Sequence, residues 1–303
     1  MDSHVEGIVT TAHRSGSIVV GVDGSEHADR ALVWAAAQAA LEHRPLTLMH
    51  AFDPVGRLFV GALELEGDNR SELVHALRRA ARIILDEAVE LVQRIGPDLE
   101  VHHELVEADP RQALVDASRT AHLLVLGSRG RGPLRGMLLG SVSVAVSQLA
   151  ACPTIVCRPR REDPDTHRVV VGADGSPASR PVIEFAFAEA SRRGVPLTVM
   201  HCFWDIVATQ SPSTASEASA DERLLLAESV AGFRESYPDV EVHLELASGL
   251  IDQVLVDAAP TADLLVVGRR HKNAVARFLH ASMAAAVLER SAGTVAVVPE
   301  AEY

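Results

Sequence analysis

The chain repeats its own sequence, and this repetition limits the possible folds more than any other feature. The segment SIVVGVDGSEHADRAL, which begins at Ser17, is matched by HRVVVGADGSPASRPV, which begins at His167. Asp23 therefore corresponds to Asp174, 151 positions later. Two further pairs match, PLTLMHAF at 45–52 with PLTVMHCF at 196–203, and AHLLVLGSRG at 121–130 with ADLLVVGRRH at 262–271. The sequence therefore predicts two copies of one domain.

Each copy alternates short β-branched runs with stretches rich in Ala and Leu, a pattern typical of βαβ units. In the first copy we expect strands near 17–23, 45–51, 100–106, 122–127 and 153–158, buried on both faces, and helices near 26–42, 71–95, 109–119 and 140–150. The second copy follows the same order. The predicted fold is α/β, with two tandem Rossmann-like domains, each a five-stranded parallel sheet flanked by helices.

The boundary between the copies is predicted at RPRREDPDTH, residues 158–167, which is charged, contains prolines and lacks apolar periodicity. We expect a flexible tail at 1–15, a first domain at 16–161 and a second at 162–303. The stretch ATQSPSTASEASADE, from Ala208, is rich in Ser, Thr and Ala, which predicts a mobile loop. A shorter analogue is expected at 53–69.

The charge balance bears on possible partners. With 41 acidic and 28 basic residues the net charge is −13, which disfavours nucleic acid and anionic membranes as partners. Lys272 is the one lysine, so contacts to phosphate must come from arginine, backbone N–H groups or a metal. The N-terminal segment has no apolar core of signal-peptide length, and the three cysteines lack CxxC spacing. We therefore expect a cytoplasmic protein whose cysteines are packing residues.

The segment GSRGRGPLRGMLLGSVS follows the fourth expected strand of the first copy. Parallel sheets bind ligands at the carboxyl ends of their strands. Here glycines allow the backbone to curl around an anion, the helix beginning at Ser141 offers N–H groups, and Ser141 and Ser143 could donate hydroxyls. Arg129, Arg131 and Arg135 add positive charge. The alternative is a flexible glycine-rich loop with surface arginines.

Two segments together, VGVDGS at 20–25 and the pattern Gly127-x2-Gly130-x9-Gly140-Ser141, resemble the ATP-binding branch of the universal stress protein family. The resemblance covers residues 15–160 and 167–300, and its domains are of the adenine nucleotide alpha hydrolase-like type. It implies that ATP, with or without Mg²⁺ or Mn²⁺, is bound by the first copy through Gly21, Val22, Asp23, Ala51, Gly127, Ser128, Arg129, Gly130, Arg131, Gly132, Gly140, Ser141 and Val142.

Asp23 also has a purely structural interpretation. Asp-Gly-Ser after a strand is an ordinary beginning of a helix, in which Asp or Ser caps the helix. Ser25 can act as the cap, which would leave Asp23 for a ligand.

The second copy departs from the pattern, because His271 and Ala281 replace the second and third glycines. We expect positive φ at these glycines, so that a Cβ there would weaken or abolish ATP binding. The corresponding site residues would be Gly172, Asp174, Cys202, Gly268 and Ser282. The opposite hypothesis is that Arg269, Arg270, His271 and Lys272 keep an anion site of altered geometry.

Three functions remain open. The first is a nucleotide-dependent regulator with an unidentified protein partner, which the resemblance places in stress adaptation. The second is a slow ATPase or related nucleotide hydrolase, although Asp23 is the one obvious carboxylate for it. The third is a nucleotide-free interaction module, which the second copy favours.

Other features give weaker expectations. The pair His102 and His103 cannot chelate one metal, because neighbouring strand residues point to opposite faces, so no metal site is expected there or at His50 and His201. The family resemblance also implies pairing through the fifth strands, TIVCRPR from Thr154 and TVAVVPE from Thr294. The copies would pair within one chain, and two chains would form a homodimer.

Overall fold

The computed structural model of the chain describes residues 14–54, 68–130, 139–159, 167–203, 212–269 and 277–301. The first repeat contains β1 (Ile18–Gly21), α1 (Glu26–Glu42), β2 (Leu46–Phe52), α3 (Asp68–Ile95), β3 (Val101–Glu107), α4 (Pro110–Ala117), β4 (Leu123–Gly127), α5 (Ser141–Leu149) and β5 (Thr154–Cys157). The second contains β6 (Val169–Gly172), η1 (Pro177–Ser179), α6 (Arg180–Arg193), β7 (Leu197–Phe203), α7 (Pro212–Ser236), β8 (Val242–Ser248), α8 (Ile251–Ala258), η2 (Ala259–Thr261), β9 (Leu264–Arg269), α9 (Arg277–Arg290) and β10 (Val295–Pro299). The strands and helices expected for the first copy are confirmed.

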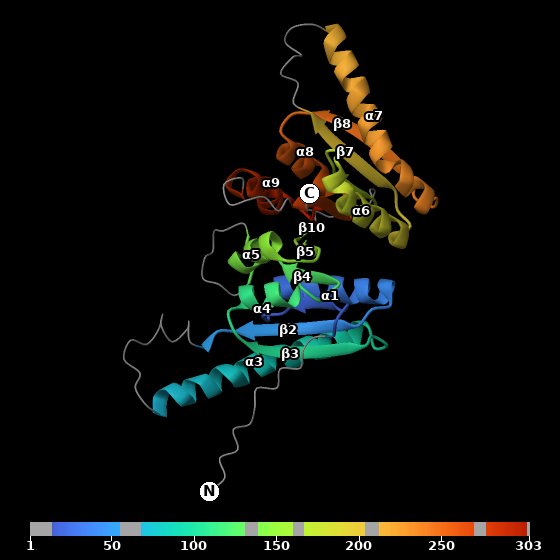
Figure 1. Cartoon of the computed structure of the whole chain (residues 1–303). Helices are drawn as coiled ribbons and strands as arrows, with labels where there is room; N and C mark the ends of the chain where they lie inside the picture. Colours follow the sequence, from blue (N-terminus) through green and yellow to red (C-terminus); the bar gives the residue numbers. More distant parts are fainter. Residues whose placement is uncertain are drawn as a thin grey trace.

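The strands form one sheet in the order β3-β2-β1-β4-β5-β10-β9-β6-β7-β8. Within each repeat all neighbouring strands are parallel, as predicted. The repeats join where β5 and β10 pair antiparallel, with Ile155 opposite Ala296 and Val156 opposite Val295. Figure 1 shows the two repeats one above the other with these strands at their junction. The expected pairing of the fifth strands within one chain is confirmed.

The strands are buried on both faces, because successive side chains point to opposite sides of the sheet. Ile18 and Val20 belong to a core cluster that extends through both repeats and includes Leu32 of α1 and Phe187 of α6. Val19, between them, belongs to a cluster on the other face with residues of α4 and α5. The sheet therefore lies between two layers of helices, which leaves the ends of its strands as the place for a ligand.

One expectation about a loop is wrong. The stretch from Ala208, predicted to be a mobile loop, contributes residues from Pro212 onward to α7. Pro212 stands at the first position of the helix, where the missing N–H of proline costs nothing, and the alanines and glutamates that follow favour helix. The rest of this stretch, and residues 55–67 of its analogue in the first repeat, lie outside the described residues.

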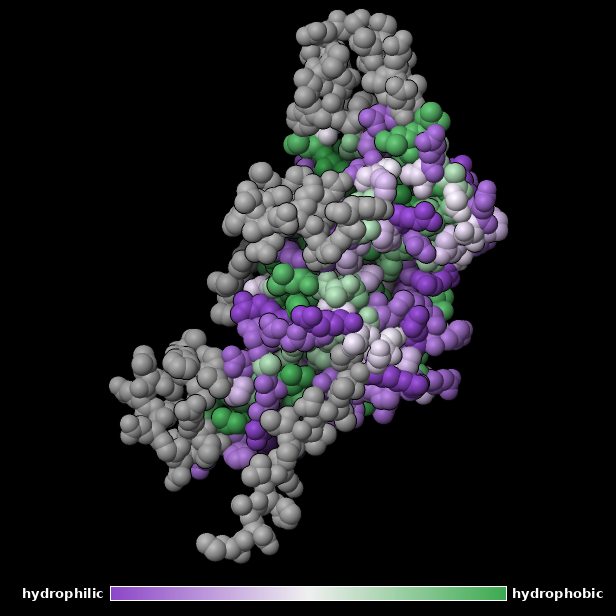
Figure 2. Space-filling view, viewed as in Figure 1, coloured by the Kyte–Doolittle hydropathy of each residue, from purple (hydrophilic) through white to green (hydrophobic). Residues whose placement is uncertain are grey.

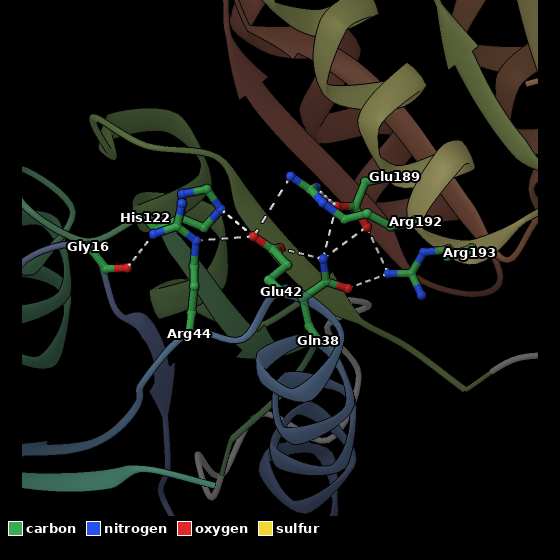
Figure 3. Close-up of polar contacts among 8 residues, drawn as sticks. All are labelled: Gly16, Gln38, Glu42, Arg44, His122, Glu189, Arg192 and Arg193. Atoms are coloured by element: carbon green, nitrogen blue, oxygen red, sulfur yellow. Dashed lines mark hydrogen bonds and ion pairs between the residues drawn. The ribbon is translucent and has the colours of Figure 1, made fainter. Parts of the chain in front are cut away.

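A buried polar network joins α1 to α6 between the repeats (Figure 3). Gln38 and Glu189, which are equivalent positions of the two repeats, face each other, and Gln38 Nε2 donates to both carboxylate oxygens at 2.9 and 3.1 Å. Arg193 donates to both side chains, and its guanidinium carbon lies 5.4 Å from the ring centroid of Trp34. The Glu189 charge is thus buried but fully engaged, which is the condition under which such a charge is tolerated.

Glu42 extends the same network toward the first repeat. Burial alone would raise the pKa of its carboxyl, but hydrogen bonds from His122 and Gln38 and the charge of Arg192 outweigh burial and lower the pKa to about 2. Glu42 therefore stays ionised at neutral pH, and its charge helps to hold the repeats together.

The surface of the described residues has hydrophobic side chains on separate elements. Ile83 on α3, Leu149 on α5, Leu224 on α7 and Leu250 before α8 are among the most exposed of them. On the face seen in Figure 2, hydrophobic residues are interspersed with hydrophilic ones, as on many protein surfaces. No helix in the described parts of the chain is both long and apolar enough to cross a lipid bilayer.

Candidate functional site

The candidate site lies at the carboxyl ends of β1 and β4, where the chain leaves the sheet toward α1 and α5. Ser25 is the N-cap of α1 and accepts the Ala28 N–H at 3.2 Å, so the expected capping role of Ser25 is confirmed. Asp23 is itself engaged, because its Oδ1 accepts the Ser25 N–H at 3.0 Å. Both residues of this motif therefore shape the turn that precedes α1.

Ser128 closes the glycine loop. Its N–H donates to the Cys157 carbonyl at 3.0 Å, and its own carbonyl accepts the Gly140 N–H at 2.8 Å, which joins the two ends of the loop. Its side chain is buried, and Oγ lies 3.2 Å from His27 Nδ1. Arg30 also lies 3.2 Å from this nitrogen and can only donate, so Nδ1 is an acceptor and Ser128 donates to it.

At two glycines of the loop the surrounding atoms leave no space for a side chain. A Cβ on Gly127 would lie 2.6 Å from backbone atoms of His27, and a Cβ on Gly130 would lie 2.4 Å from Asp23 Oδ2. The expectation of positive φ at Gly130 and Gly140 is wrong, because neither is among the glycines with positive φ. A Cβ on Gly140 would meet ordinary contacts at 3.4 Å and beyond. A side chain is therefore excluded at Gly127 by the backbone of α1 and at Gly130 by the Asp23 carboxylate, whereas Gly140 has room for one.

The N-terminal end of α5 provides backbone donors. Gly140 is its N-cap with φ −72° and ψ 144° and has no side chain to cap the helix, and the first helical hydrogen bond comes from the Val144 N–H. The Ser141 side chain is exposed there. Ser143, in contrast, is buried and donates to the Gly127 carbonyl at 2.7 Å, so its expected role as a phosphate donor is wrong. The N–H groups of this first turn and the helix dipole favour an anion.

Positive charge surrounds the loop, and sequence reasoning missed part of it. Burial lowers the pKa of His27, and the charges of Arg30 and Arg129 lower it further. Burial also lowers the pKa of Arg158, with a further contribution from Arg129. His27 is therefore neutral at neutral pH, with the positive charges of Arg30 and Arg129 near it. The position of His27 in the first turn of α1, after Asp-Gly-Ser, was the signal available in the sequence.

The remaining residues implied for the first copy are partly placed. Gly21 lies against Leu126 and Leu114, where a Cβ would be 2.8 Å from Leu126, and Val22 is buried in the core. Ala51 is the residue before the last of β2 and pairs with Val106 of β3. Val142 is half-buried in the first turn of α5. Arg131, Gly132 and Arg135 lie outside the described residues.

The second repeat keeps the turn but uses its loop differently. Asp174 Oδ1 accepts the Ser176 N–H at 3.0 Å, as Asp23 does in the first repeat. Beside Gly268, however, a Cβ would lie 2.4 Å from the Glu300 carboxylate. Arg269, at the position of Ser128, donates to the carbonyls of Gln148 and Ala150 in the first repeat.

The structure describes some of the other residues expected at the site of the second repeat. Gly172 packs against Leu255, and Cys202 is half-buried in β7. Ser282 lies within α9, while Arg270, His271 and Lys272 fall outside the described residues. The hypothesis of a side-chain anion site therefore loses Arg269, whose guanidinium contacts the first repeat.

The conspicuous histidines have structural partners. His50 Nδ1 donates to the Val22 carbonyl at 2.6 Å, and His201 Nδ1 donates to the Ala173 carbonyl at 2.9 Å. His102 contacts Glu100 at 3.0 Å on the exposed strand β3. Within the described ranges, no three or more His, Cys, Asp or Glu side chains are grouped to hold a metal ion.

Comparison with known proteins gives matches over both repeats. Residues 15–158 and 166–299 each match the universal stress protein family. A universal stress protein of Mycolicibacterium smegmatis is 35% identical over 291 residues, covering 93% of this chain and 96% of the relative. One from Mycobacterium tuberculosis is 34% identical over 302 residues, covering 96% and 99%. A solved universal stress protein from Archaeoglobus fulgidus shares the fold, with a TM-score of 0.66 at 19% identity over 94% of this chain and 99% of that chain.

Proposed function

The chain belongs to the universal stress protein family, and from this premise we propose that its first repeat binds ATP and acts as a nucleotide-dependent regulator in stress adaptation. The observation that carries the proposal is the loop between β4 and α5, closed by Ser128 and Gly140, which ends at the uncapped first turn of α5. Phosphate oxygens would accept the N–H groups of this turn, and the adjacent arginines would balance their charge.

The contact between Gly130 and Asp23 holds the first part of the loop against the end of β1. The absence of a Cβ lets the backbone at Gly130 approach the Asp23 carboxylate, and Asp23 is held in turn by the Ser25 N–H. Gly130 thereby lies against the end of β1, where the family resemblance puts the ribose and base. A contact that exists before the nucleotide binds lowers the entropy cost of binding.

For the second repeat we propose weak or absent nucleotide binding. The Glu300 carboxylate lies where a Cβ of Gly268 would point, and a phosphate near it would meet a like charge. The Arg269 guanidinium, which could have offset that charge, contacts carbonyls of the first repeat. The two repeats would therefore divide their roles.

Binding is favoured over hydrolysis. Asp23, the carboxylate that the sequence singles out for an ATPase, has one oxygen on the Ser25 N–H and the other against Gly130, which is the position of an anchor for the loop. A bound ATP would bring any Mg²⁺ or Mn²⁺ mainly on its own phosphate oxygens. We therefore expect at most slow turnover.

The proposal is tested by titrating ATP into purified full-length variants. Gly130→Ala should weaken binding by at least about 100-fold, because its methyl group would displace Asp23 or the loop. Asp174→Ala, in the second repeat, should stay within about twofold of wild type. Gly232→Ala is the matched control, because a Cβ there meets nothing within 4 Å. Full loss of binding in Asp174→Ala, or unchanged binding in Gly130→Ala, would contradict the proposal.

We also propose that two chains associate as a homodimer. Since β5 and β10 pair with each other inside the chain, a second chain would have to use other surfaces, and β3 and β8 are the outer strands of the described sheet. A dimer mass in light scattering is the expected result, and a monomer mass over the accessible concentrations would contradict it.

A further inference from the structure

Helix α5 of the first repeat is held by the second repeat. Leu139, just before its N-terminal end, is 2% exposed and belongs to a buried cluster with Leu255 of α8 and Val287 of α9. Val144, in the middle of the helix, packs against the same cluster. Arg269 of β9 contacts the C-terminal end. The second repeat therefore contributes to the packing just before α5 and donates hydrogen bonds at its C-terminal end, in addition to the packing of α5 on α4 and β5 of its own repeat.

Arg269 makes the polar part of this contact. It is 8% exposed, its Nη1 donates to the Gln148 carbonyl at 2.7 Å, and its Nη2 donates to the Ala150 carbonyl. Burial lowers the pKa of Arg269. A guanidinium stays protonated in proteins even so, and it therefore brings a positive charge to the negative end of the helix dipole.

This contact matters because α5 is short. It has nine residues, no side-chain N-cap and no basic residue in its last turn. Helices of this length are marginal in isolation, and the carbonyls of the last turn have no partner within the helix. The order of α5 must therefore come from outside the helix, and Arg269 satisfies two of the carbonyls at its end.

We propose that Arg269 is a positioning residue for the anion site of the first repeat: by holding the C-terminal end of α5, it fixes the helix whose N-terminal end receives the phosphates. The inference rests on the proposed function, because α5 is the helix that follows the glycine loop. It also gives a role to the departure of the second repeat, where the residue equivalent to Ser128 is an arginine whose side chain contacts the neighbouring repeat.

The opposite contact across the junction is of the same kind. Arg158, after β5, donates to the Leu288 carbonyl near the C-terminal end of α9, the helix equivalent to α5. Helix α9 has fourteen residues and carries Arg290 in its own last turn, so it depends less on an external cation. The crossed contacts are therefore unequal, and the stronger dependence belongs to the helix of the proposed ATP site.

The experiment compares full-length Arg269→Gln and Arg269→Lys with wild type. Arg168→Gln is the matched control, because Arg168 is an arginine of the second repeat that donates to Thr198 and Thr261 within that repeat. Two quantities are measured: amide hydrogen exchange of residues 141–150, and affinity for ATP by titration. Arg269→Gln should speed exchange in α5 and weaken ATP binding, each by about tenfold. Arg269→Lys keeps the positive charge but cannot donate to two carbonyls as the guanidinium does, so its exchange rate and ATP affinity should lie between those of wild type and Arg269→Gln. Arg168→Gln should match wild type.

The outcomes separate this inference from the proposed function. If the wild type binds ATP and Arg269→Gln binds it equally well, the inference is overturned and the proposed function stays intact. If wild type binds no ATP, the proposed function fails, and unchanged exchange in α5 would overturn the role of Arg269 as well. If Arg269→Gln does not fold, Arg269→Lys decides: weaker ATP binding with faster α5 exchange supports the role, and wild-type values for both overturn it.

Discussion

The loops that follow β4 and β9 begin at equivalent glycines, but the residues directly after those glycines make different contacts. In the first repeat, Ser128 joins the ends of its own loop and donates to His27. In the second, Arg269 at the same position reaches across the junction to α5. The two repeats have the same strand order and the same Asp-Gly-Ser turn, so the difference lies in the loops, where Arg269 replaces Ser128 and Glu300 lies beside Gly268. A duplicated fold can therefore keep its architecture while equivalent positions of its two copies make different contacts.

The turn after the first strand shows what does not distinguish the repeats. Asp23 and Asp174 each accept a backbone N–H two residues later at 3.0 Å. Gly24 and Gly175 both have φ of +70°, which only glycine adopts readily. An intact Asp-Gly-Ser motif is thus a sign of the fold, and the ligand must be inferred from what lies against the aspartate.

The largest expected difference between the repeats is at the glycine near the end of β4, Gly127, and its equivalent in β9, Gly268. In Gly127→Ala the new methyl would meet the backbone of α1 at 2.6 Å, whereas in Gly268→Ala it would meet the end of the Glu300 side chain, which can rotate away. We expect Gly127→Ala to lower the free energy of unfolding by about 3 kcal/mol and Gly268→Ala by less than about 1 kcal/mol. Guanidinium denaturation measures both. Equal losses would show that the two strand ends are packed alike.

A smaller effect is expected in the network between α1 and α6. The folded-state pKa of Glu42 is about 2 against an ordinary value of 4.5, so its stabilising contribution is complete above pH 4.5 and is lost as pH falls from 4.5 toward 2. Glu42→Gln should lose about 2 kcal/mol at pH 7 and lack this part of the acid dependence.

The measurement is the free energy of unfolding as a function of pH for wild type and Glu42→Gln. Glu26→Gln is the control, because Glu26 forms an exposed pair with Arg30 and should change stability by less than about 0.5 kcal/mol. If the free energy of unfolding of Glu42→Gln depends on pH as that of wild type does, the Glu42 carboxyl has no role in acid stability.

The smallest effect is expected at Gly140. Its φ of −72° suits any residue, and a Cβ would contact Arg129 Cα at 3.4 Å, so Gly140→Ala should change ATP affinity by less than about threefold. The result would sharpen the comparison, because alanine already stands at the equivalent position, Ala281. A large loss of ATP affinity in Gly140→Ala would show that alanine at this position weakens binding, and Ala281 would then help to explain weak binding by the second repeat.

Much of the fold could be predicted from the sequence. The helix expected at 26–42 is α1, and pairing of the fifth strands follows from the family resemblance. The pattern of apolar residues determines the helix locally, whereas the strand pairing joins segments about 140 positions apart and was implied by the resemblance alone. The beginning of α7 is hard to predict, because its Ser and Thr residues are typical of loops while the alanines and glutamates beside them favour helix.

The site was predicted less completely, because its decisive contacts join distant residues. The pattern of glycines located the loop, but it does not determine φ, and Gly130 is demanded by the nearby Asp23 carboxylate. The contact of Ser128 with His27 spans 101 positions, and that of Arg269 with Gln148 spans 121. No local propensity encodes such pairs: the first forms only when β1 and β4 pair within the first repeat, and the second only when the two repeats are folded against each other.

The division of roles between the repeats is tested most directly by counting nucleotides. The purified full-length protein is saturated with ATP, separated from unbound ligand and denatured, and the released nucleotide is identified and counted per chain. The account predicts one ATP per chain, lost in Gly130→Ala and kept in Asp174→Ala. Two per chain would contradict the inactive second repeat, and none would contradict the ATP site itself.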